Sequence, residues 1–295
     1  MNTGKNKWKL GALALAGAAA LCAGAVWALQ SDLTVTEYPV ELPTGLEGLE
    51  GLTIAQIADV HSADIQKELK AALEAVSPHL IVFTGDLINR EDRDLSRALS
   101  LAAMAAKIAP AYFVPGNHEA DNPCYPELRE GLEAAGVTLL EDRAVVLEYP
   151  GGRVNLIGMR DLTFCPEGRE AARAALPGRV AALLEEGALN VLLCHRPSLL
   201  AEYAQGGADL VFTGHAHGGQ VRLPLVGPLF APDEGVLPAH TAGVYQSGKT
   251  RMVVSRGLGN GTPFPRLWNG PELVAVTLHS AGQTGQGPEQ KEAET

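Results

Sequence analysis

Cysteine is scarce in this sequence of 295 residues, and the few cysteines form no recognisable motif. None of the four belongs to a Cys-x-x-Cys pair, and Cys22 lies in an apolar N-terminal stretch with no polar neighbour that could share a metal. The spacing excludes a small disulfide-stapled scaffold and a cysteine-based zinc site. A bridge between Cys124 and Cys165 stays open as an alternative if the domain folds outside the cytoplasm.

Positive charge is also in short supply. The chain has 23 Lys and Arg residues against 34 Asp and Glu residues, which gives a formal net charge of -11. Proteins hold nucleic-acid phosphates with clustered Lys and Arg, and we find no such cluster, so we expect no nucleic-acid partner. The length and the 46% hydrophobic content suit one large globular domain with its own core.

One long apolar run stands near the N-terminus. Residues 10–29 contain no charged residue and follow the lysines at positions 5, 7 and 9. About twenty helical residues span about 30 Å, the thickness of a bilayer core. We therefore expect residues 1–30 to be a transmembrane or signal-anchor helix, with the rest of the chain exported. A signal peptide cleaved after Ala28, which would release a secreted protein, is the alternative.

Five apolar runs typical of buried strands each lead into residues that can bind a metal ion. The runs cover residues 52–58, 80–84, 112–115, 190–194 and 208–212. Ligands of α/β sheets bind beyond the carboxyl ends of the strands, and imidazole is the commonest metal-binding side chain, so the five ends predict one metal site. The residues that follow the runs are Asp59 and His61, Asp86, Asn117 and His118, His195, and His215 and His217.

Segments of helical periodicity alternate with these runs. We expect helices at residues 66–76, 95–108, 126–135, 167–186 and 198–205. We expect further strands at 137–140, 144–149, 154–158, 243–246, 251–255 and 273–278, after a linker and a first strand within residues 31–51. The alternation predicts an α/β domain over residues 31–279. Residues 280–295 lack large apolar side chains and are expected to form a disordered tail.

The motifs Asp59-x-His61, Gly85-Asp86, Gly116-Asn117-His118-Glu119, His195 and Gly214-His215-x-His217, in this order, resemble the calcineurin-like metallophosphoesterase superfamily. The resemblance covers about Leu52 to Leu278, and the stretches 214–224 and 254–259 are similar to its bacterial membrane-associated YkuE/YaeI-like branch. Val60 and Ala216 differ from the usual motif residues of that branch, at positions that bind no metal. The resemblance implies a four-layer αββα sandwich of two mixed sheets flanked by helices.

The resemblance also implies two divalent metal ions. Ions about 3.5 to 4 Å apart repel each other and need a shared anionic ligand. A ligand set of His, Asp and Asn favours Mn, Fe or Zn over Mg or Ca. Carried over to this sequence, Asp59, His61 and His217 would hold one ion, Asn117, His195 and His215 would hold the other, and Asp86 would bridge them.

The implied reaction is hydrolysis of a phosphoric ester by in-line attack of a metal-bridging hydroxide. A phosphodiester is the first choice and a phosphomonoester the alternative. His118 resembles the catalytic histidine of the family, which protonates the leaving alkoxide or hydrogen-bonds the phosphoryl group. Arg222 and Arg256 could meet phosphate or be structural.

A membrane-anchored domain suggests a lipid-linked or cell-envelope phosphate, such as a UDP-diacylglucosamine-type pyrophosphate. Two other classes stay open, a metal-binding envelope pseudoenzyme and a structural envelope protein. No obligate protein partner is evident from the sequence.

Overall fold

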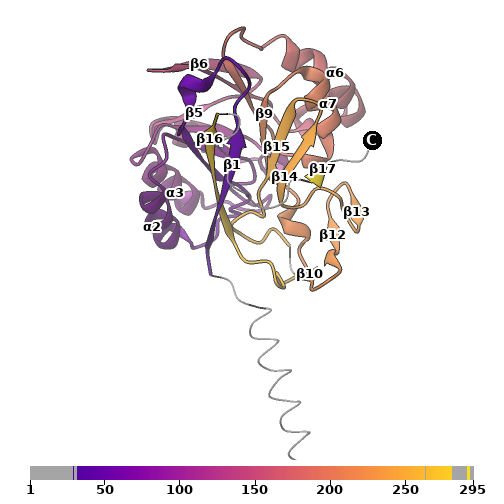
Figure 1. Cartoon of the computed structure of the whole chain (residues 1–295). Helices are drawn as coiled ribbons and strands as arrows, with labels where there is room; N and C mark the ends of the chain where they lie inside the picture. The colour runs from indigo at the N-terminus through magenta and orange to yellow at the C-terminus, as the bar shows by residue number, and fades with distance from the viewer. Residues whose placement is uncertain (1–28, 30–31, 263, 281–290, 293–295) are drawn as a thin grey trace, which may run out of the picture.

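The computed structural model describes residues 29, 32–262, 264–280 and 291–292 (Figure 1). The expected membrane segment, residues 10–29, lies outside these residues except for Leu29. Within the described part of the chain, no helix combines the length and the apolar character needed to cross a bilayer.

Six strands form the first sheet, in the spatial order β1-β16-β2-β3-β4-β5. The run from β2 to β5 is parallel, whereas β16 pairs antiparallel with β2 and parallel with β1. β16 therefore lies between β1 and β2 and joins β1 to the rest of the sheet. The strands are β1 (Thr34–Glu41), β2 (Thr53–Ile57), β3 (Leu80–Thr84), β4 (Ala111–Val114), β5 (Val137–Leu139) and β16 (Glu272–His279).

Seven strands form the second sheet, in the order β17-β14-β15-β9-β8-β7-β6. Its centre, from β15 through β9 and β8 to β7, is parallel, and β14 and β6 are antiparallel to their neighbours β15 and β7. The strands are β6 (Arg143–Tyr149), β7 (Gly152–Gly158), β8 (Leu189–Leu193), β9 (Leu210–Thr213), β14 (Gly243–Ser247), β15 (Thr250–Val254) and β17 (Lys291–Glu292).

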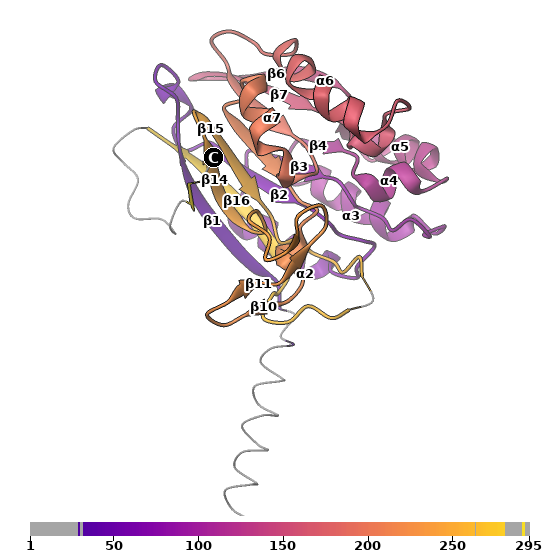
Figure 2. The ribbon, with the colours of Figure 1, turned by 90° about the vertical axis from the view of Figure 1, so that its right-hand side faces the viewer.

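The two sheets pack face to face, and helices cover their outer faces (Figures 1 and 2). Alternate residues of β3 show the arrangement: Leu80 and Val82 point into the core between the sheets, whereas Ile81 and Phe83 pack against helices. The predicted α/β sandwich of two mixed sheets is confirmed. The helices are α2 (Gln66–Val76), α3 (Ser96–Ala106) and α5 (Tyr125–Ala134) on the first sheet, and α6 (Arg169–Ala181) and α7 (Leu200–Gly206) on the second.

Short elements complete the fold, most of them in the loops around one edge of the sheets. They include the helix α4 (Asn117–Asp121), the 3-10 helices η1 (Glu47–Leu49), η2 (Leu162–Phe164), η3 (Pro197–Leu199) and η4 (His217–Gly219), and two small hairpins. The first hairpin joins β10 (Arg222–Leu223) to β11 (Gly227–Pro228), and the second joins β12 (Phe230–Ala231) to β13 (Gly235–Val236).

One expected helix ends earlier than predicted, and two further observations concern the C-terminal stretch and the cysteines. The helix predicted for residues 167–186 ends at Ala181, and the chain then turns through Gly187, whose φ is 71°. Lys291–Glu292 pairs with β14 within the stretch expected to be disordered, most of which lies outside the described residues. Cys124 and Cys165 are free thiols rather than a disulfide.

Candidate metal centre

The carboxyl ends of five parallel strands, β2, β3 and β4 in one sheet and β8 and β9 in the other, meet at one edge of the sandwich. The loops that follow them turn sharply. Five of the predicted site residues adopt a positive φ, a conformation that costs energy for any residue except glycine and that gathers at functional sites. These residues are Asp59, His61, Asp86, His215 and His217, with φ between 48° and 66°.

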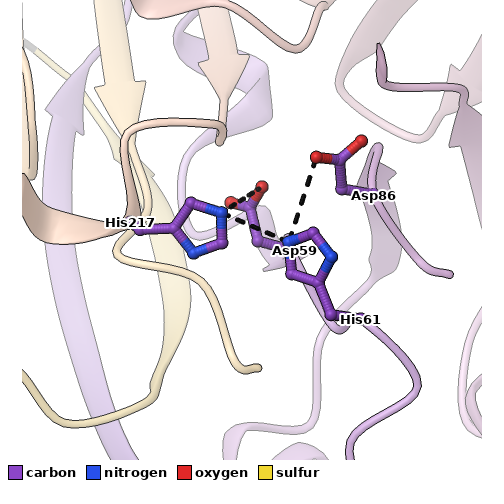
Figure 3. A group of neighbouring side chains, drawn as sticks. All are labelled: Asp59, His61, Asp86 and His217. Carbon is purple, nitrogen blue, oxygen red and sulfur yellow. Dashed lines mark hydrogen bonds and ion pairs between the residues drawn. The ribbon is translucent and has the colours of Figure 1, made fainter. Parts of the chain in front are cut away.

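The first group of side chains at this edge is Asp59, His61, Asp86 and His217, all buried. One ligand atom from each lies within 4.8 Å of the others. Figure 3 shows the imidazoles of His61 and His217 facing each other, with Nε2 atoms 3.2 Å apart and the two carboxylates beside them. His61 Nε2 is 3.9 Å from Asp86 Oδ2, and His217 Nε2 is 3.8 Å from Asp59 Oδ1.

The second group is Asp86, His195 and His215, with Asn117 at its side. His195 Nε2 lies 3.2 Å from Asp86 Oδ2, 3.1 Å from His215 Nδ1 and 3.2 Å from Asn117 Oδ1. Asp86 belongs to both groups. The structure thus brings together all seven residues that the sequence predicted as ligands, in the same two sets and around the same shared carboxylate.

Backbone amides hold the two carboxylates in place. Asp59 accepts a hydrogen bond from His215 N at 3.0 Å, which ties the end of β2 to the end of β9. Asp86 Oδ1 accepts from His118 N at 2.9 Å, which ties the end of β3 to α4. An added Cβ at Gly116 would stand 2.3 Å from Asp86 Oδ1, so this close approach requires glycine.

Glu119 organises the loops from inside. Its fully buried carboxylate accepts hydrogen bonds from four backbone amides, which belong to the loop after β3 and to the start of α4. Hydrogen bonds from amides to a carboxylate are stronger than those between neutral groups. Glu119 therefore fixes the positions of Asp86 and Asn117 without facing the metal groups itself. The four donors are the amides of Asp86, Leu87, Ile88 and Gly116.

Hydrogen bonds on the far side of two imidazoles select the nitrogen that faces the site. His195 Nδ1 donates to the carbonyl of Thr84 at 2.8 Å, which leaves Nε2 free to bind. His215 Nε2 donates to Asp233 Oδ2 at 3.1 Å, which leaves Nδ1 free. This partner on the outer nitrogen is the usual support of a metal-binding histidine.

Asp233 is itself anchored by a buried ion-pair network. Arg196 donates to Asp233 and also to both carboxylate oxygens of Asp161, at 2.6 and 3.0 Å. The hydrogen bond from His215 and the charge of Arg196 hold the pKa of Asp233 well below its usual range. Asp233 is therefore a carboxylate at neutral pH and accepts a hydrogen bond from His215 Nε2.

The electrostatics of the groups fit bound cations. Burial lowers the pKa of His61 to about 3 and also lowers the pKa values of His215 and His217, so these imidazoles are neutral at pH 7, the form that binds metal. Burial acts on His195 too, but the Asp86 and Asp59 carboxylates outweigh it and raise its pKa to about 10.

Neither of the two carboxylates forms an ion pair with a Lys or Arg side chain in the described ranges. His195 is the cationic side chain paired with Asp86 in these ranges, and buried negative charge beyond what it balances is costly. Two carboxylates, four imidazoles and an amide oxygen therefore make a donor set suited to two divalent cations of the first transition row.

His118 lies beside the two groups without belonging to either. Its Nε2 is 3.9 Å from Asp86 Oδ2, and its ring meets that of His61 edge to face at 4.6 Å. Its side chain keeps 14% exposure, whereas those of His61 and His195 are inaccessible. Burial lowers the pKa of His118 despite the nearby Asp86. An accessible imidazole at this distance can exchange a proton with a bound substrate.

Sequence reasoning missed the network of Asp161, Arg196 and Asp233. Asp161 follows β7 as the other predicted residues follow their strands, so the same strand-end rule could have singled it out. Arg196 directly follows His195 and could have been examined for that reason. Asp233 lies in the turn between β12 and β13, and its sequence neighbourhood gives no signal of a contact with His215.

The arginines beside the motifs have different surroundings. Arg222 donates to the carbonyl of Gly218, and Arg256 pairs with the buried Glu272 at 3.0 Å, so both make structural contacts. Arg266, which the sequence did not single out, lies with Nη2 3.2 Å from His217 Nδ1. It is the arginine next to the first group of side chains.

Comparison with known proteins identifies the family. The family model described as calcineurin-like phosphoesterase matches residues 52–219, more than half of the chain. This chain is a calcineurin-like phosphoesterase. As a member of the family, it is a metal-dependent phosphoester hydrolase that uses two divalent metal ions.

Named relatives of this calcineurin-like phosphoesterase come from several bacteria. It is 28% identical over 257 residues to the uncharacterized metallophosphoesterase YkuE of Bacillus subtilis, covering 84% of this chain and 86% of YkuE. It is 31% identical over 190 residues to the phosphodiesterase YaeI of Escherichia coli, covering 62% and 64%. It is 24% identical over 316 residues to the UDP-2,3-diacylglucosamine pyrophosphatase LpxG of Chlamydia muridarum, covering 85% and 92%. The expected relation to YkuE and YaeI is confirmed.

Proposed function

We propose that this calcineurin-like phosphoesterase is a phosphodiesterase with its two metal ions at the paired groups of side chains. The observation that carries the proposal is the position of Asp86, whose Oδ2 lies 3.2 Å from His195 Nε2 and 3.9 Å from His61 Nε2. One carboxylate between two imidazole sets is what two neighbouring cations need to share. The proposed ligands are Asp59, His61 and His217 for one ion and Asn117, His195 and His215 for the other, with Asp86 common to both.

Two bound divalent cations supply Lewis acidity, which lowers the pKa of a coordinated water and neutralises charge on phosphoryl oxygens. The residues of the chain do the rest. His118 stands on the accessible side of Asp86, and in its protonated form it donates a proton to the leaving alkoxide. Asp233 and Thr84 keep His215 and His195 in the tautomers that face the site.

The preference for a diester rests on relatives. YaeI is named a phosphodiesterase, which supports the diester, and LpxG is named a UDP-2,3-diacylglucosamine pyrophosphatase, which supports a lipid-linked substrate. We propose a lipid-linked or cell-envelope phosphate as the substrate class for this chain. The phosphomonoesterase and the metal-binding pseudoenzyme are the alternatives that experiment must separate.

We also propose that residues 10–29 anchor the enzyme in a membrane, with the catalytic domain outside the cytoplasm. The run of twenty residues without charge and the three lysines before it support this topology. Cleavage after Ala28 would instead release the domain as a secreted protein.

The test uses the full chain, purified in detergent without chelator. We would measure metal content per chain and, after addition of Mn, hydrolysis of a bis-aryl phosphodiester and of the matching aryl monoester. About two metal ions per chain and faster cleavage of the diester support the proposal. Faster cleavage of the monoester would make the enzyme a phosphomonoesterase, and bound metal without cleavage of either ester would favour the pseudoenzyme.

A further inference from the structure

Six large apolar side chains lie on the surface of three loop segments beside the metal centre. They are the most exposed large apolar side chains of the described residues, and Leu225, Val236 and Phe264 reach 108%, 77% and 69% exposure. Exposed apolar patches of this kind mark interaction surfaces. We call the set the apolar rim, and its members are Leu225, Val226, Phe230, Val236, Leu237 and Phe264.

Hydrogen bonds join the three segments into one surface. Leu229 N donates to the carbonyl of Val221 at 2.9 Å, which links the start of the β12–β13 hairpin to the residue before β10. Gln220 Nε2 donates to the carbonyl of Phe264 at 2.6 Å, which links the third segment to the residue that precedes the first hairpin. The three segments that carry the apolar rim are therefore held next to one another by hydrogen bonds.

Two leucines of the rim occupy backbone conformations that favour glycine or asparagine. Leu225 has a φ of 69° and Leu237 a φ of 54°. A bulky residue at positive φ is disfavoured, and neither leucine gains a buried site in return, because both side chains are exposed. Outliers of this kind point to a function of the side chain outside the fold.

The apolar rim carries no free charge. Residues 223–231, 235–239 and 260–265 contain no Asp, Glu, Lys or Arg. The acids between the hairpin strands are both paired, Asp233 with Arg196 and His215, and Glu234 with His240 at 2.6 Å. A surface without charge on a chain of net charge -11 suits a hydrocarbon phase better than an ionic partner.

The rim lies where the chain enters the domain. A cavity of about 720 Å³ is lined by Asp32 and Thr34, the first residues of the domain, together with Leu225, Val226 and Trp268. Figure 2 shows β10 and β11 beside the beginning of β1. The apolar run of residues 10–29 ends only two residues before residue 32 in the sequence. An anchor leaving a bilayer at this point would hold the β10–β11 hairpin close to the lipid.

We propose that the apolar rim is a bilayer-contacting surface, which seats the domain on the hydrocarbon of a phospholipid membrane and turns the metal centre toward the lipid headgroups. The proposal rests on the N-terminal anchor proposed above. The same segments border the centre, because Asp233 bonds to His215 and a Cβ added at Gly261 would stand 2.6 Å from the His61 ring. The substrate class that fits is a phosphodiester carried by a lipid, whose acyl chains stay in the bilayer during hydrolysis.

The test places a fluorescent probe on the rim of the full chain in phosphatidylcholine vesicles. Single cysteines at Leu225→Cys or Val236→Cys carry a nitrobenzoxadiazole label, in a background without the accessible cysteines. Matched control labels replace Val146 and Leu184, which are exposed apolar residues on other elements. The background substitutions are Cys22→Ala, Cys124→Ser and Cys165→Ser, and the buried Cys194 is kept.

We expect phosphatidylcholine with a doxyl group on its acyl chain to quench the rim probes at least twofold more than the control probes. Equal quenching at rim and control positions would overturn the proposal, and so would a chain that does not sediment with the vesicles. If the rim probes become shielded from water as protein concentration rises, but are not quenched by the doxyl lipid, the rim contacts a second copy of the chain. This result would also overturn the proposal. Hydrolysis of the soluble bis-aryl diester by the protein in the same vesicles tests the proposed function separately.

Discussion

The bridging position of Asp86 makes the Asp86→Asn variant the sharpest test of the metal centre. Asparagine keeps the size of the side chain. It also keeps an oxygen that can accept the hydrogen bond that His118 N donates to Asp86 Oδ1 at 2.9 Å. It removes the negative charge and replaces the oxygen that faces His61 and His195 with an amide NH2 group. The variant therefore separates the shared anion from the packing around it.

The magnitude follows from the charges. Two divalent cations about 4 Å apart repel by roughly 17 kcal/mol at an effective dielectric constant of about 20. A carboxylate about 2 Å from both ions offsets this repulsion fully at the same dielectric constant. Even if these Coulomb energies are wrong by about twofold, loss of the carboxylate weakens binding of the second ion by several kcal/mol. We expect Asp86→Asn to hold at most one metal ion per chain and to lose at least about 10³-fold in kcat/KM, or about 4 kcal/mol of transition-state stabilisation.

The assay combines metal analysis of the dialysed protein with hydrolysis of the bis-aryl diester. Asp64→Asn, which changes an exposed carboxylate in the loop after β2, is the control and should keep both metal ions and full activity. Without metal, Asp86→Asn should unfold at a lower denaturant concentration than the unaltered chain, because it removes the carboxylate that pairs with the buried His195 ring. Two metal ions in Asp86→Asn, or lost activity with both metals retained, would refute the bridging role.

Three further substitutions test the surroundings of the centre. His118→Asn should lower kcat by about 10²- to 10⁴-fold with metal content unchanged, and metal analysis that shows a lost ion would make His118 a ligand instead. Asp233→Asn should weaken binding of one metal ion by about 10- to 100-fold in a metal titration, whereas Glu234→Gln should leave both affinities as they are. Glu119→Gln turns an amide NH2 toward backbone N–H donors and should lower the free energy of unfolding by about 1–3 kcal/mol in urea; an effect no larger than that of the exposed Glu127→Gln would contradict its role in holding the loops.

The fold and the inner residues of the centre could be predicted because they follow local rules. Strands such as β3 are apolar on both faces because both are covered, so they appear in the sequence as unbroken apolar runs. In a parallel sheet the carboxyl ends of these runs share one edge, so the residues after them converge whatever the intervening loops do. Asp59, Asp86 and His195 were found in this way.

The supporting contacts could not be predicted because they join segments without a shared pattern. Asp233 reaches His215 from a hairpin turn, and its partner Arg196 comes from the end of β8. Each of these contacts depends on side-chain direction and on loop shape, which the periodicity of a sequence does not encode. The exposure of Leu225 is of the same kind, since an apolar residue in a sequence does not reveal whether it packs inward or projects outward.

Asp233 connects the two parts of the molecule that the proposals concern. It lies in the turn between β12 and β13, the hairpin that carries Val236, and its carboxylate accepts a hydrogen bond from His215. Contact with a bilayer would shift this hairpin relative to its position in water. The hydrogen bond from His215 to Asp233 would transmit such a shift to the centre. The ion pair with Arg196 opposes this, because it ties Asp233 to the buried Asp161 and to the rigid end of β8. The network thus holds the orientation of the His215 imidazole, and we expect it to do so whether or not the proposed contact of the rim with lipid forms.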